Sequence, residues 1–143
     1  GAKQGAIDSA AKAIEDYVEK QYELCTFGNS NLTGTQYLDA FKINATSGKC
    51  ELDVAKIKKE LIVATGYDKK IENIYILPTF KKDASGNDIT GPEGYTGQFT
   101  VYVQGTAKGE FGSITTTTYP TATQIADTTK YHGGQTDSTV RPS

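Results

Sequence analysis

The chain has 143 residues, of which 36% are apolar and 22% are charged, and this is enough for one domain with a modest core. Its net charge of −2 argues against general nucleic-acid binding, because phosphate backbones are held by clusters of Lys and Arg. No apolar run approaches the roughly 20 residues that span a bilayer. A single histidine, His132, leaves little room for histidine-dependent catalysis.

Residues 5–24 are predicted to form an amphipathic helix. Apolar side chains recur at spacings of three and four, namely Ile7, Ala10, Ala11, Ile14, Tyr17, Val18 and Tyr22. The charged residues between them, including Asp8, Glu15 and Glu19, are expected on the exposed surface. No Ser, Thr or Asp precedes the first turn, so we expect this helix to be the second part of a longer one.

The only two cysteines are Cys25 and Cys50. They are interpreted either as one disulfide, formed in an oxidising compartment, or as two unpaired thiols at a helix end and in a loop. The even number favours the disulfide. Together with His132 they do not supply the four ligands of a closed zinc site, so no metal site is predicted.

The region 25–70 is predicted to be a largely irregular connection with a second helix. A short helical piece is expected at 36–41, and a longer one at 53–65. Asp53 can cap this second helix, and Gly66 stands where a left-handed residue would end it. Its apolar stripe consists of Val54, Ile57, Leu61 and Ala64.

Beyond Gly66 the apolar period changes to two, which indicates strands at 71–80 and 98–104. A turn at 105–109 is expected to lead into a further strand at 110–118, which completes an antiparallel hairpin. The tail 119–143 has few apolar anchors and is either draped over the sheet or loosely ordered.

The order of elements predicts a single α+β domain, 1–143, with a long N-terminal helix packed on a small antiparallel β-sheet. Residues 1–24 form the helix, 25–70 the helix-containing loop region, 71–118 the sheet and 119–143 the polar tail.

No catalytic residues and no cofactor are predicted. His132 lies in a polar stretch without a neighbouring nucleophile, and the helix carboxylates are interpreted as surface charges. The oxygen-rich segment 83–88 raises a calcium hypothesis, but it lacks the bidentate Glu of an EF-hand and is interpreted as a turn. Triplets at 31–33 and 44–46 fit the N-glycosylation pattern and indicate surface loops.

One side of the first helix is rich in small residues, at Ala6, Ala10 and Ala13. Either these alanines let another helix approach closely, or they reflect helix propensity alone. The adjoining edge, formed by Ile7, Ile14 and Val18, is expected to be covered by the sheet.

The segment Ala2 to Gln21 resembles the second half of the long N-terminal helix of type IV pilins, and most closely those of Gram-positive bacteria. The shared features are an Ala/Ser-rich amphipathic stretch and the ending Tyr17-Val18-Glu19-Lys20. The order of one long helix, a variable loop region, an antiparallel sheet and a variable tail is similar as well.

This resemblance implies a non-catalytic structural subunit of a pilus or related filament on the cell surface, active in adhesion, aggregation or twitching motility. The implied partners are other copies of the subunit, and the implied membrane anchor is a missing hydrophobic segment before Ala2, whose N-terminus the family methylates. Many pilins close a disulfide around the C-terminal part of the sheet. A Cys25–Cys50 bridge would depart from that pattern and leaves the subfamily, and the choice between major and minor subunit, open.

Two alternatives come from other classes. The first is a secreted binding module or protease inhibitor with a cystatin-like helix-on-sheet plan, although the Gln-x-Val-x-Gly loop of cystatins is absent. The second is a small enzyme with a helix and a curved sheet, which the shortage of His disfavours.

Overall fold

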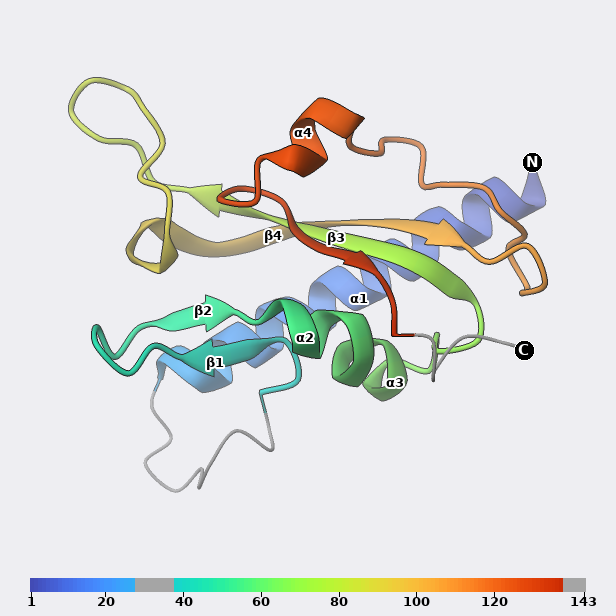
Figure 1. Ribbon diagram of the computed structural model, residues 1–143, viewed down its shortest axis with the longest axis horizontal. Helices are drawn as coiled ribbons and strands as arrows, with labels where there is room; N and C mark the ends of the chain where they lie inside the picture. The colour runs from blue at the N-terminus through green and yellow to red at the C-terminus, as the bar shows by residue number, and fades with distance from the viewer. Residues whose placement is uncertain (28–37, 138–143) are drawn as a thin grey trace.

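The structure is a computed structural model that describes residues 1–27 and 38–137 (Figure 1). Its elements are, in chain order, α1 (Ala2–Thr26), β1 (Phe41–Ile43), β2 (Cys50–Leu52), α2 (Val54–Lys56), η1 (Ile57–Leu61), α3 (Ile62–Ala64), β3 (Ile71–Phe80), η2 (Pro92–Gly94), β4 (Tyr95–Gly105), α4 (Ala122–Ala126) and β5 (His132–Gln135). The class is α+β, with the N-terminal helix packed on small antiparallel sheets, as the sequence predicts.

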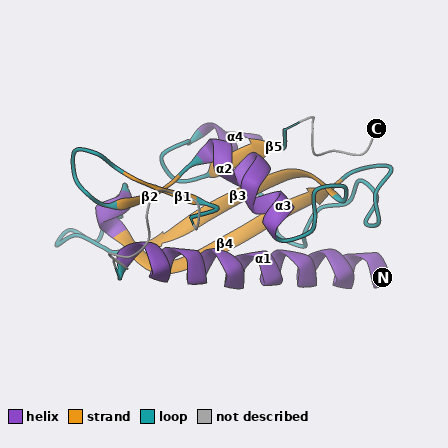
Figure 2. Cartoon of the chain, turned by 90° about the horizontal axis from the view of Figure 1, so that it is seen from below, coloured by secondary structure: helices purple, strands orange, loops and turns teal. Residues whose placement is uncertain are grey.

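The main sheet has three antiparallel strands in the order β4-β3-β5. Helix α1 lies along β4 as a long rod, and one side of it faces away from the rest of the chain (Figure 2). The helix begins at Ala2, after Gly1 and without a side-chain cap, and ends at Thr26. It is therefore slightly longer than predicted.

The core lies between α1, the second helical segment and one face of the sheet. Ile74 pairs with Val103 and Ile76 with Val101, so alternation along both strands places all four side chains on the same buried face. Ile14 of α1 is fully buried in the same cluster. At about 25 cal/mol per Å² of apolar surface, such burial is the main stabilising contribution to the fold.

The predicted helix at 53–65 exists, as α2, η1 and α3 in unbroken succession. Asp53 caps it by accepting a hydrogen bond from the Ala55 amide. At its end, Tyr67 N–H binds the Ile62 carbonyl and Gly66 N–H binds the Val63 carbonyl, the Schellman pattern that needs the positive φ of Gly66, +82°. The middle of the segment is π-helical, which the apolar spacing did not predict.

Two predictions for the loop region and sheet are wrong. Within 36–41, the described residues form a turn and the start of strand β1, which pairs with β2 as a small second sheet. The expected strand at 110–118 is reduced to one bridge between Gln104 and Thr115. Residues 106–113 form successive turns. Only residues 114–116 bond to the β4 backbone, and the next residue, Thr117, bonds to α1.

The tail is draped over the sheet and supplies its third strand. Gly133 and Gly134 of β5 pair with Tyr75 and Ile74 of β3. Gly133 has φ +137°, and a Cβ there would lie 2.1 Å from the Ile74 carbonyl oxygen. Gly133, which looks like a loop residue in the sequence, therefore allows this strand to approach β3.

Candidate functional site

The candidate site is helix α1, whose sides have different surroundings. Of the residues singled out from the sequence, Ile7, Ile14 and Val18 are fully buried and Ala10 is 3% exposed. Ala6 and Ala13 are exposed. The three alanines therefore do not share one free face.

The exposed side of α1 is formed by small residues along its first half. These are Ala2, Gly5, Ala6, Ser9 and Ala13. They recur at helical spacing, on the side of the helix opposite to the buried stripe. The second half of the same side has charged residues, including Asp16 and Lys20.

The flank of α1 between these two sides is bound to the outer edge of β4. Glu19 Oε2 accepts a hydrogen bond from the Phe99 amide at 3.0 Å, and Glu15 Oε1 accepts one from the Val101 amide at 3.4 Å. Both carboxylates are half-buried, so the expectation that they are surface charges is wrong for this pair. We name Glu15 and Glu19 the carboxylate pair of α1.

The next outward-facing amides along the β4 edge form hydrogen bonds with the segment after β4. The Val103 amide binds Thr116 Oγ1 at 3.4 Å, and the Gly105 amide binds the Ile114 carbonyl at 2.9 Å. With the carboxylate pair, every second amide from Phe99 to Gly105 thus has a partner outside the sheet. Buried or half-buried backbone donors need such partners, because leaving one without a hydrogen bond costs stability.

Near its start, α1 binds the chain around Thr117, just after the β-bridge between Gln104 and Thr115. Asp8 accepts hydrogen bonds from the Thr117 amide at 2.8 Å and from the Thr117 hydroxyl at 2.6 Å. These bonds lower the pKa of the Asp8 carboxyl, with the hydroxyl contributing most. Gln4 Nε2 donates to the Thr115 carbonyl at 3.0 Å. Asp8 is therefore a structural acceptor and not an unused surface charge.

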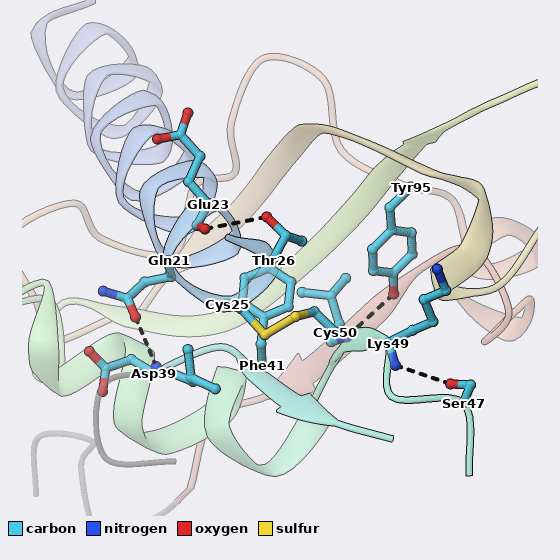
Figure 3. Close-up of a disulfide and its surroundings, with 12 residues drawn as sticks. Gln21, Glu23, Cys25, Thr26, Asp39, Phe41, Ser47, Lys49, Cys50 and Tyr95 are labelled. Atoms are coloured by element: carbon cyan, nitrogen blue, oxygen red, sulfur yellow. Dashed lines mark hydrogen bonds between the residues drawn. A yellow bond between two sulfur atoms is a disulfide. The ribbon is translucent and has the colours of Figure 1, made fainter. Parts of the chain in front are cut away.

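The other end of α1 is joined covalently to β2 by the Cys25–Cys50 disulfide, with Cα atoms 6.1 Å apart (Figure 3). Both cysteines are 7% exposed. The Tyr95 hydroxyl lies beside the bridge and accepts a hydrogen bond from the Leu52 amide at 3.3 Å. Burial raises the pKa of Tyr95 to about 12.

The last turns of α1 also hold the chain that leads into β1. Gln21 is buried, and its Oε1 accepts a hydrogen bond from the Asp39 amide at 3.3 Å (Figure 3). The Tyr17 hydroxyl donates to Asp39 Oδ2. Burial, followed by this hydrogen bond, raises the pKa of Tyr17 to about 12.

The segment 83–88, for which the sequence raised a calcium hypothesis, is a turn held by its own hydrogen bonds. Asp83 Oδ1 accepts hydrogen bonds from the Ser85 and Asn87 amides, at 2.8 and 2.9 Å. Asp88 forms ion pairs with Lys82 and Lys130. In the described ranges, no group of three or more His, Cys, Asp or Glu residues is arranged to hold a metal ion.

The remaining residues singled out from the sequence, His132 and the two N-glycosylation triplets, do not belong to α1. His132 is the first residue of β5, and burial lowers its pKa. Asn44 lies in the turn after β1, where its side chain accepts hydrogen bonds from the Thr46 and Ser47 amides. The triplet 31–33 lies outside the described residues.

Sequence reasoning missed the carboxylate pair of α1. Glu15 and Glu19 are four residues apart, so they share a flank of the helix, and Gln4 and Asp8 continue that flank toward the N-terminus. This spacing could have indicated the contact, because four polar side chains along one flank of a helix can form hydrogen bonds with the backbone of an adjacent strand edge.

Comparisons with known proteins leave the family open: no family model, curated protein or solved structure matches this chain. Among residues 1–27 and 38–137, no helix combines the length and apolar character that a membrane span requires.

Proposed function

We propose that this chain is a non-catalytic structural subunit of an extracellular filament similar to a type IV pilus, and that its partners are other copies of itself. The observation that carries this proposal is the division of α1 into a buried and an exposed side. The helix has 25 residues and spans about 37 Å, and the small residues along the first half of its outer side are exposed.

Small side chains favour close helix packing, because the distance between two helix axes depends on the side chains at the contact. Ala6, Ser9 and Ala13 would let a neighbouring helix approach near the lower limit of about 8 Å. Asp16 and Lys20 further along the same side offer opposite charges to a neighbour in a staggered arrangement.

The attachments of α1 to the rest of the domain also favour a filament subunit. The disulfide fixes its C-terminal end, and the carboxylate pair fixes its middle to β4. A helix held in this way passes an axial load directly to the sheet. The disulfide is also typical of proteins that fold outside the reducing cytosol.

Surface-charge substitutions on α1 test this proposal in the organism that carries the gene. The gene is deleted, and the strain is complemented with the wild type, with Ala6→Arg or Ala13→Arg, or with Ala55→Arg. Ala55 is the matched control, because it is an exposed helical alanine outside α1. Negative-stain electron microscopy of the cells then scores surface filaments.

We expect filaments with the wild type and with Ala55→Arg, and none with either α1 variant. Thermal unfolding of the purified domains provides the control for folding, and we expect all three variants within about 0.5 kcal/mol of the wild type, because the substituted residues are exposed. Filaments that persist in the deletion strain, or that form equally with Ala13→Arg, would refute the proposal.

A further inference from the structure

A second feature lies on the face of β4 that points away from the core. The chain that leaves β4 returns over the sheet through α4 to β5, in orange and red in Figure 1. Between this returning segment and β4 is a cleft of about 360 Å³. It is lined by Tyr102, Thr117, Thr118, Tyr119, Pro120, Gln124 and Tyr131.

Aromatic rings form the walls of this cleft, which we name the tyrosine cleft. The rings of Tyr102 and Tyr131 lie with centroids 6.2 Å apart and planes tilted by 38°. Tyr119 packs edge-on against Tyr75, with centroids 6.0 Å apart. The three tyrosines that line the cleft, Tyr102, Tyr119 and Tyr131, are half-buried, so part of each remains accessible to a ligand.

The polar groups of the tyrosine cleft are neutral, and several are available. None of its lining residues is Asp, Glu, Lys or Arg. Within the described chain, the hydroxyls of Tyr102, Tyr119 and Tyr131 have no hydrogen-bond partner. A tyrosine hydroxyl is protonated at neutral pH and can donate, and burial raises the pKa of Tyr102 further.

The walls are held in place before any ligand arrives. Thr121 and Gln124 form a capping box at the start of α4, in which Gln124 Oε1 accepts a hydrogen bond from the Thr121 amide at 2.8 Å. The amide nitrogen Nε2 of Gln124 is left as a donor. At the other end, Asp127 fixes the turn before Tyr131 by binding Thr129. A preorganised site loses less entropy on binding.

We propose that the tyrosine cleft binds a neutral sugar unit of a glycan. A pyranose ring presents apolar C–H groups on one face, which pack on aromatic rings, and hydroxyls around its rim, which pair with neutral donors and acceptors. The cleft volume falls at the lower end of the roughly 300–1,000 Å³ of small-ligand sites. A charged ligand would find no opposite charge among the lining residues. This inference does not depend on the proposed filament.

Nuclear magnetic resonance titration of the ¹⁵N-labelled chain tests the inference. The probes are four neutral disaccharides, namely cellobiose, lactose, maltose and diacetylchitobiose, and two charged comparators, sialyllactose and a heparin-derived disaccharide. Each is added to about 10 mM, which would nearly saturate a site with a Kd of about 1 mM. We expect at least one neutral disaccharide to shift the amide signals of Tyr102, Thr118 and Tyr131.

Three variants establish where the sugar binds. Tyr131→Ala is expected to weaken binding by roughly threefold to tenfold, the effect of losing one aromatic contact. Tyr131→Phe keeps the ring and is expected to retain most of the affinity. Gln98→Ala, at an exposed β4 residue outside the cleft, is the control and is expected to bind like the wild type.

A folded Tyr131→Ala variant that binds as tightly as the wild type would overturn the assignment. So would shifts caused only by the charged comparators, or no shift with any neutral disaccharide. Where Tyr131→Ala does not fold, the wild-type titration still decides, because shifts confined to amides outside the residues that line the cleft would overturn the assignment.

Discussion

The Glu19 carboxylate accepts a hydrogen bond from the backbone amide of Phe99, 80 residues further along the chain, at 3.0 Å. A helix side chain thus occupies a position that a neighbouring strand would otherwise fill. Glu15 does the same for Val101, one helical turn earlier. Together these contacts set the position of α1 along β4.

Removing the Glu19 acceptor is expected to destabilise the domain. Glu19→Leu leaves the Phe99 amide without its partner, and the free energy of unfolding should fall by about 1–3 kcal/mol. Glu19→Gln keeps an acceptor oxygen and should lose less. Urea denaturation gives the free energies, and hydrogen exchange should be faster at the Phe99 amide in Glu19→Leu.

The control is Glu23→Gln, because Glu23 is an exposed carboxylate on the same helix. Its free energy of unfolding should stay within about 0.5 kcal/mol of the wild type. Equal effects of Glu19→Leu and Glu23→Gln would contradict a specific role for the contact with Phe99.

Opening the disulfide is expected to lower stability by about 3.5 kcal/mol, the chain-entropy value for a loop of about 25 residues. The double variant Cys25→Ala, Cys50→Ala should therefore unfold at lower urea concentration than the wild type. Its midpoint should not respond to dithiothreitol, whereas that of the wild type should. A wild-type midpoint that ignores a reductant able to open the bridge would contradict this prediction.

Acidification is expected to weaken the bond between Asp8 and Thr117. Because the pKa of Asp8 is lowered in the folded state, the contribution is fully present above the ordinary aspartate value of about 3.9. It is lost as the pH falls from there through the folded-state pKa. A carboxyl-detected nuclear magnetic resonance titration measures that pKa directly.

Thr117→Val is expected to return the pKa of Asp8 part of the way to its ordinary value, because the backbone amide of residue 117 remains. Thr123→Val, at an exposed position of α4, should leave it unchanged. An unchanged Asp8 pKa in Thr117→Val would show that the hydroxyl does not cause the shift.

Adding a methyl group by a Gly→Ala substitution is expected to lower the free energy of unfolding at Gly133 and to raise it at Gly5. Gly133→Ala places a Cβ 2.1 Å from the Ile74 carbonyl oxygen at φ +137°, and should cost about 2 kcal/mol or more by displacing β5. Gly5→Ala lies in α1 with open space around it, and should stabilise the domain by about 0.5–1 kcal/mol. Denaturation midpoints of the two variants should therefore lie on opposite sides of the wild type.

Periodicity predicted the elements whose side chains alternate or recur clearly. Strand β3 has the predicted bounds, and the second helix has both its predicted cap at Asp53 and its predicted end at Gly66. In each case the signal is local, because it depends on residues within a few positions of one another.

The elements that were missed depend on contacts distant in sequence. Strand β5 contains Gly133 and Gly134, which have no side-chain pattern and pair only because β3 offers a complementary edge. The expected strand at 110–118 is mostly replaced by turns: residues 106–113 bond to one another, and the carboxylate pair of α1 holds the Phe99 and Val101 amides further along the β4 edge. Which of two partners occupies a strand edge is decided by tertiary geometry, which a single sequence does not display.

The carboxylate pair of α1 has a consequence for how copies of this chain can meet. Where Glu15 and Glu19 hold the Phe99 and Val101 amides, β4 offers no open donors to template a cross-β stack. A strand of another copy could therefore add to this part of the β4 edge only after displacing the helix from it.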